Sequence, residues 1–231
     1  MSIRARVLEA LGTVYDPELD EPITSLEFVT SCDVSAEGDV EVRLRLPTSQ
    51  CAPNFAFLMA ADARAAVRRL PEAREVRVVL EDHCTDDEIN AAVARGSGFA
   101  QAFPGETEGD LDALRRLFRR KALVARQSRV CEALLAAGAT PEQVTARRVA
   151  ELGGDPDARR CLELRAQLGI ATDAGDPAFV LPDGEPIAAA DLRHWLRIAR
   201  LVRTSLESNG GMCRSLLRVR YHLPDSEEIA A

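Results

Sequence analysis

The first hundred residues pass from a helical spacing of apolar positions to an alternating one and back. Apolar residues three or four apart predict a helix over Ile3–Val14. Extended patterns follow over Ile23–Val34 and Val40–Leu46, with a turn at residues 35–39 between them. Because a short polar turn joins two strand-like runs, we expect an antiparallel hairpin here.

A second helix and a third strand follow this hairpin. Phe55–Leu70 has a helical pattern rich in Ala and Leu, and Glu75–Leu80 is rich in Val. Thr85–Glu88 resembles a capping box, which predicts a helix to about Arg95. The glycines and proline of residues 96–105 indicate a linker.

The rest of the chain has mainly helical patterns. A small turn is expected at residues 179–187, and Ser208–Gly211 is predicted to separate the last two helices. The helical runs are 111–135, 140–153, 155–169, 190–206 and 213–223. The sequence therefore predicts an α+β fold, with a helix–strand–strand–helix–strand domain over residues 1–104 and a mainly α-helical domain over residues 105–231.

The predicted topology gathers donor side chains at one edge of the sheet. If the second and third strands are parallel, their carboxyl ends meet, and the loop before the first strand faces the same edge. The residues brought together are Cys51, Asp82, His83, Cys84, Asp16 and Glu18. Thiolate, imidazole and carboxylate groups suit iron or zinc better than magnesium or calcium.

Cys51 is the central candidate in this group. It lies where a strand ends and a helix begins, and Pro53 suits the first turn of that helix. A helix amino terminus favours a thiolate, the form of cysteine that binds metals. Supporting candidates in the same loops are Thr48, Ser49, Asn54 and Asp82.

Each candidate also has an ordinary structural interpretation. Cys51 and Cys84 could be packing residues, His83 a surface residue, and Asp16 and Glu18 turn acids. Thr48 and Ser49 could only cap the helix, and Asn54 is equally ambiguous. Three cysteines in apolar patterns are expected in the core, and one after a Gly-Gly pair is left open. These are Cys32, Cys131 and Cys161, and then Cys213.

Composition and charge narrow the function classes. The 231-residue chain is 46% hydrophobic with a net charge of −8, and its acidic excess lies in the first 105 residues, which argues against a nucleic-acid partner. Its six cysteines form no CxxC pair, so free thiols in a reducing compartment are expected. Without a long apolar run or a signal-peptide pattern, we expect a soluble cytoplasmic protein with no membrane contact.

The first hundred or so residues resemble the MIP18-like (DUF59) domain family of iron–sulfur cluster assembly factors. The resemblance rests on Asp16-Pro17-Glu18-Leu19 after a helix, the strand pair, and the Thr48–Cys51 loop before Pro53. It implies a compact α+β fold similar to NifU-type cluster carriers, with Cys51 as the key thiolate beside the Asp16–Glu18 loop. The helical half looks like the extension of actinobacterial members thought to accompany soluble di-iron monooxygenases.

These observations favour a non-enzymatic accessory factor for cofactor assembly. Cys51 would bind iron or an iron–sulfur cluster transiently, with zinc as an alternative metal. The helical half would recognise a client metalloenzyme, for which a di-iron monooxygenase component is the candidate, and a homodimer that shares metal through two Cys51 residues stays open. The rival hypotheses are a metal-free interaction module for an oxygenase and a thiol enzyme with His83 as base.

Overall fold

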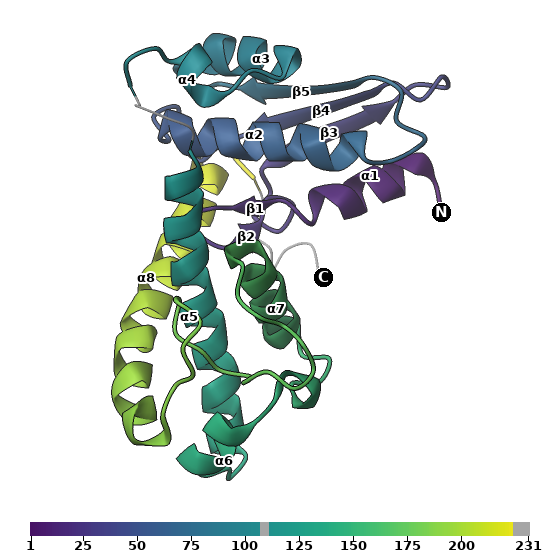
Figure 1. Cartoon of the computed structure of the whole chain (residues 1–231). Coiled ribbons are helices and arrows are strands. Elements are labelled where there is room, and N and C mark those ends of the chain that lie inside the picture. The colour runs from purple at the N-terminus through teal and green to yellow at the C-terminus, as the bar shows by residue number, and fades with distance from the viewer. Residues whose placement is uncertain (107–110, 224–231) are drawn as a thin grey trace. The chain divides into compact units, whose positions relative to one another are not determined.

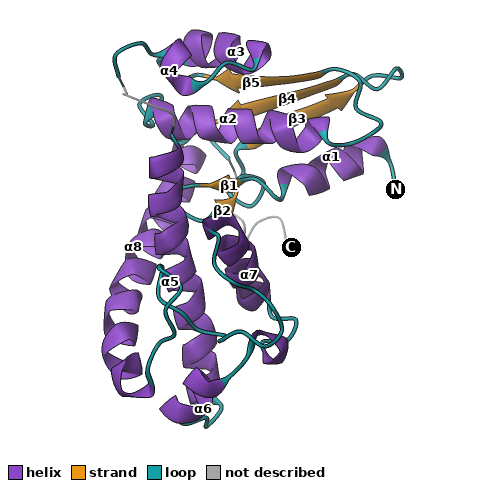
Figure 2. Cartoon of the chain, viewed as in Figure 1, coloured by secondary structure: helices purple, strands orange, loops and turns teal. Residues whose placement is uncertain are grey.

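The structure is a computed structural model that describes residues 1–106 and 111–223. The chain divides into two compact units (Figure 1). Unit 1 contains Met1–Asp112 together with the stretch that begins at Ser208, and unit 2 contains Ala113–Glu207. The architecture is an α+β part followed by a mainly helical part, as predicted (Figure 2). None of the described helices is long and apolar enough to cross a membrane.

Unit 1 is built on a three-stranded sheet in the order β3-β4-β5. β3 (Val29–Val34) and β4 (Val40–Arg45) form the predicted antiparallel hairpin. β5 (Val76–Glu81) pairs with β4 in parallel, from Val40 opposite Val76 to Arg45 opposite Glu81. The carboxyl ends of β4 and β5 therefore lie side by side, which confirms the edge predicted from the sequence.

Helices cover this sheet and connect its strands. α1 (Ile3–Leu11) packs against β3 and α2, and α2 (Pro53–Arg68) is the crossover between the parallel strands (Figure 1). Residues of β4 alternate between buried and half-buried positions, because one side chain in two points into the helix-covered core. α3 (Asp86–Arg95) follows β5 and packs against it.

The apolar run that begins at Ile23 is not extended over its whole length. Residues 23–27 form turns, and β3 begins only at Val29. The N–H of Phe28 donates to the carbonyl of Ile23, and Glu27 has a positive φ of 61°. The apolar residues of this segment are nevertheless buried, namely Ile23, Leu26 and Phe28. Their spacing therefore indicates burial in the core and does not indicate a strand.

Two local expectations in the next segment are also corrected. Thr85 precedes α3, but its side chain makes no capping hydrogen bond and its hydroxyl lies 3.1 Å from His83 Nδ1. Residues 96–105 are not a plain linker, because they contain the short helix α4 (Phe99–Ala102). The ring of Phe99 packs edge-on against that of Phe57 from α2, at 5.6 Å between centroids.

Unit 2 is mainly helical (Figure 2). A capping box at Thr140 begins α6, which is shorter than the helical run expected from residue 140 to 153. The expected turn after residue 179 contains an isolated bridge between Val180 and Pro186. Its helices are α5 (Asp112–Ala136), α6 (Pro141–Ala146), the 3₁₀ helix η1 (Val149–Glu151), α7 (Pro156–Leu168) and the first part of α8 (Ala189–Tyr221).

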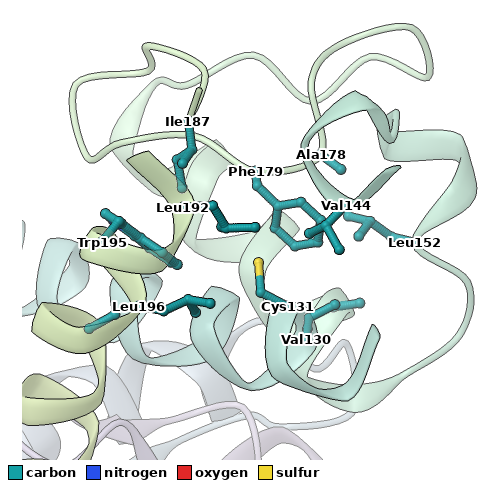
Figure 3. Close-up of a cluster of buried hydrophobic side chains, with 12 residues drawn as sticks. Val130, Cys131, Val144, Leu152, Ala178, Phe179, Ile187, Leu192, Trp195 and Leu196 are labelled. Carbon is teal, nitrogen blue, oxygen red and sulfur yellow. The ribbon is translucent and has the colours of Figure 1, made fainter. Parts of the chain in front are cut away.

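A hydrophobic core holds unit 2 together (Figure 3). Phe179 lies among side chains from α5 and α8, including Cys131 and Leu192, and each of the three is at most 1% exposed. The buried amide of Gln127 ties the 179–187 segment to α5, since it donates to the Val180 carbonyl and accepts from the Val180 N–H, both at 2.9 Å. The backbone groups of this non-helical segment are thereby satisfied.

The helix break predicted at Ser208–Gly211 is wrong. α8 continues without interruption from Ala189 to Tyr221. Glycine in a helix interior costs about 1 kcal/mol relative to alanine but does not stop the helix. A Cβ atom at Gly210 would lie 2.6 Å from Glu21 Oε1, so the missing side chain lets the helix approach this carboxylate. Gly210, which in the sequence indicated a helix break, is instead a position where α8 packs closely against Glu21.

Candidate functional site

The loops at the carboxyl ends of β4 and β5 meet in unit 1. After β4 the chain passes through Thr48 and Ser49 to Cys51, and after β5 it passes through Asp82 and His83 to Cys84. The N–H of Cys84 donates to the carbonyl of Ser49 at 3.0 Å, which joins the two loops directly. Asp82 turns its loop with a positive φ of 56°.

Cys51 is half-buried beside the amino terminus of α2. Ala52 is the N-cap residue and has no side chain that could accept a hydrogen bond, and Pro53 occupies the first turn. The Cys51 sulfur lies 3.4 Å from Thr48 Oγ1. A hydroxyl at this position can donate to a thiolate, so Thr48 contacts the reactive atom itself. Asn54 instead accepts the N–H of Phe55 at 2.8 Å through its side-chain oxygen.

His83 holds the Cys51 loop through its imidazole ring. His83 is 5% exposed, its Nε2 lies 2.7 Å from the Cys51 carbonyl oxygen, and its Nδ1 accepts the N–H of Thr85 at 3.2 Å. Because Nδ1 accepts a backbone N–H, Nε2 carries the proton and donates to the carbonyl. Both nitrogens have partners, and neither is bonded to the Cys51 thiol as a general base would be. The predicted role of His83 as a metal ligand stays a prediction that requires one of these bonds to break.

Asp16 and Glu18 lie on a small hairpin that the sequence patterns did not predict. β1 (Tyr15–Asp16) pairs with β2 (Glu21–Pro22), so that Asp16 faces Glu21. Asp16 Oδ1 accepts the N–H groups of Glu18 at 2.8 Å and Leu19 at 3.0 Å. Burial raises the pKa of Asp16 to about 6, although these two hydrogen bonds lower it.

A residue from the far end of the chain adjoins this group. Cys213 of α8 is half-buried, and burial raises the pKa of its thiol to about 11. The negative charges of Asp16, Cys51 and Glu18 add to the rise, so these groups lie close enough to Cys213 to interact with it. The predicted site residues did not include Cys213, although a helical face of Gly210, Cys213 and Leu217 was a readable signal.

The remaining thiols separate into exposed and buried ones. Cys84 is exposed, and Cys32, Cys131 and Cys161 are buried as predicted. All six cysteines are free. Within residues 1–106 and 111–223, no group of three or more His, Cys, Asp or Glu side chains is arranged to hold a metal ion. Any ion bound by the described side chains would keep coordination positions open for other ligands.

Comparison with known proteins places the part of this edge that contains Asp16, Glu18 and Cys51 within a family. Residues 4–79, which include Asp16, Glu18 and Cys51, match the iron-sulfur cluster assembly protein family. An uncharacterized protein of Methanocaldococcus jannaschii is 32% identical over 90 residues, which is 93% of that protein and 39% of this chain. No solved structure matches the chain.

Mycobacterial proteins give a second comparison. Iron-sulfur cluster carrier proteins of Mycobacterium bovis and Mycobacterium tuberculosis are each 38% identical over 79 residues. The match covers 34% of this chain but only 20% of each carrier's length. His83, Cys84, Cys213 and the whole of unit 2 lie beyond the residues matched to the family. Through its N-terminal unit, which spans nearly all of the Methanocaldococcus relative, the chain belongs to the iron-sulfur cluster assembly protein family.

Proposed function

We propose that this protein is an accessory factor that holds iron or an iron–sulfur cluster transiently at Cys51 during the maturation of a client metalloenzyme. The observation that carries the proposal is the Cys51 thiol itself. It is half-buried at the meeting point of two loops, contacts a hydroxyl, and lies within the residues matched to the family. Cysteine thiolates are the usual protein ligands of iron–sulfur clusters.

The open coordination of this edge suits a cargo more than a resident cofactor. A closed structural metal site has about four protein ligands. The described side chains supply no group of three. A metal ion or cluster held by one or two thiolates could be released to a client by exchange of its remaining ligands. The family name refers to iron–sulfur clusters and gives no support for zinc, so the proposal is limited to iron.

The decisive experiment is anaerobic reconstitution of the full chain with ferrous iron and sulfide. We expect Cys51→Ser to lose most of the iron and sulfide that the wild type retains after desalting. Cys32→Ala is the matched control, because it removes a buried thiol from the same sheet without changing the edge. Equal retention by the wild type and Cys51→Ser would contradict the proposal.

A metal-free interaction module is the second candidate, and the lack of a three-donor group among the described residues favours it. In that case Cys51→Ala would keep both client binding and client activity. Nothing in the comparisons identifies the client. Recognition by unit 2, a di-iron monooxygenase as client, and a homodimer bridged at Cys51 therefore stay predictions. Client activation assayed with wild type and Cys51→Ala separates the two functions.

A further inference from the structure

The last turns of α8 are anchored to all three loops of the Cys51 edge. Arg214 forms an ion pair with Glu21, the residue that faces Asp16 in the β1–β2 hairpin. Arg220 donates to the carbonyl of Leu46 at 3.2 Å and to that of Asp82 at 2.7 Å. Those two carbonyls lie just after β4 and β5, so one guanidinium bridges the strand ends that lead to Cys51 and Cys84.

These anchors determine which face of α8 meets the edge. Gly210 and Leu217 are seven residues apart, which is close to two turns, and Arg220 lies one further turn along, toward the same side of the helix. Gly210 adjoins the Glu21 carboxylate, and Leu217 is fully buried. Cys213 lies on the same face, between the contact with the β1–β2 hairpin and the contact with the strand ends.

The surroundings of Cys213 differ from those of a packing cysteine. Cys131 is enclosed among apolar side chains in the core of unit 2 and is fully buried. Cys213 is only half-buried, and it lies near enough to the Cys51 thiol to interact with it electrostatically. Its thiol therefore lies on the face of α8 that contacts the edge and is not enclosed in an apolar core.

We propose that Cys213 is a second thiolate ligand for the iron or iron–sulfur cargo held at Cys51, an inference that rests on the proposed function. Two thiolates from segments far apart in sequence would form a soft-donor pair at the carboxyl edge of the sheet. Asp16 and Glu18 belong to the neighbouring β1–β2 hairpin and do not complete a group of three donors with the two thiols. Because the second thiolate comes from beyond the family-matched residues, this chain would complete the shared edge with its own C-terminal helix.

Anaerobic titration of the full-length protein with Co²⁺ tests the assignment, since sulfur-to-cobalt charge-transfer absorption reports the number of thiolates bound. We expect Cys213→Ser to reduce this absorption to about half and to weaken Co²⁺ binding by about tenfold or more. We expect Cys51→Ser to reduce the absorption and weaken Co²⁺ binding at least as much. Circular dichroism of each variant checks that α8 is retained.

The double variant Cys213→Ser/Ser215→Cys is the matched control. Ser215 is exposed on α8, so this variant keeps six thiols but moves one off the anchored face. It should bind Co²⁺ as weakly as Cys213→Ser does. If Cys51→Ser loses binding while Cys213→Ser binds like the wild type, the assignment of Cys213 is overturned and the proposed function stands. If Cys51→Ser itself binds like the wild type, the proposed function fails.

Discussion

At the scale of single residues, the edge combines the half-buried Cys51 thiol with several groups that hold its loop in position. His83 fixes the Cys51 carbonyl, and Thr48 contacts the thiol. Asp16 uses one carboxylate oxygen to close the turn through Leu19 while it is almost fully buried. Because these contacts are short-range, substitution of any one of these residues should change the conformation of its loop before it changes the sheet.

The raised pKa of Asp16 gives a pH dependence of stability. Because its folded pKa is about 6 and its ordinary value is 3.8, the native state binds more protons than the unfolded state between these values. Stability contributed by protonated Asp16 is therefore full below about pH 4 and is lost as the pH rises through 6. The loss reaches at most about 1.4 kcal/mol per pH unit.

Asp16→Asn should remove the part of the pH dependence of stability that comes from Asp16. The asparagine keeps a side-chain oxygen for the turn but does not ionise. We expect urea unfolding in the presence of a chelator to show that the variant gains stability relative to the wild type as the pH rises from 4 to 7. Parallel stability curves for the two proteins would show that Asp16 ionises normally in the folded chain.

At the scale of elements, α8 contains a glycine, a poor helix former, at a position where a close contact requires it. Gly210 and Gly211 both lie within the helix and both lower its intrinsic stability. Their surroundings differ, because a Cβ atom at Gly210 would meet Glu21 Oε1 whereas one at Gly211 would meet nothing within 4 Å. Only the first glycine has a packing role in the described structure.

This difference predicts unequal changes in stability for two matched substitutions. Gly211→Ala should stabilise the protein by about 0.5–1 kcal/mol, because alanine is the better helix former. Gly210→Ala should gain less, because the Glu21 side chain must move and its ion pair with Arg214 is disturbed. Urea midpoints of the two variants measure the difference, and equal gains would contradict the close approach of α8 to Glu21.

At the scale of the whole molecule, the chain combines a family domain with a helical unit that has its own core. The family match ends at residue 79, whereas unit 1 also takes in the segment that begins at Ser208. The cluster of buried residues around Phe179 lies between Val130 and Ala199, entirely within unit 2. The net charge of −8 belongs to the N-terminal half, which suits a partner with a basic surface or a cationic cargo.

Separate cores predict separate responses to core truncation. Phe179→Ala should cost about 3–5 kcal/mol and speed hydrogen exchange in unit 2, because it leaves a cavity. The rate of Cys51 alkylation should stay unchanged. Phe57→Ala is the matched substitution in unit 1, where Phe57 is 5% exposed and contacts Phe99, and it should speed Cys51 alkylation. A change of alkylation rate in Phe179→Ala would show that the two cores are coupled.

The sequence by itself determined the local elements and the position of the central thiol. Alternation over β4, the Ala-rich run of α2 and Pro53 at its start are short-range signals, so they placed Cys51 between a strand and a helix. The order of the elements allowed a parallel pairing of β4 and β5, which the structure then showed. The buried cysteines were recognisable because they lie within apolar patterns.

Only the tertiary structure decided what surrounds that thiol. The apolar spacing at Ile23 suggested a strand but belongs to buried turns, and the glycines near Cys213 suggested a helix break but lie within α8. Both predictions failed because a local pattern does not specify which distant residues a segment packs against. Both nitrogens of His83 are occupied by groups that sequence spacing could not identify. The segment that carries Cys213 is held at the edge by the ion pair of Arg214 with Glu21 and the hydrogen bond of Arg220 to Asp82. These partners are more than 130 positions away, and such long-range contacts leave no local periodicity.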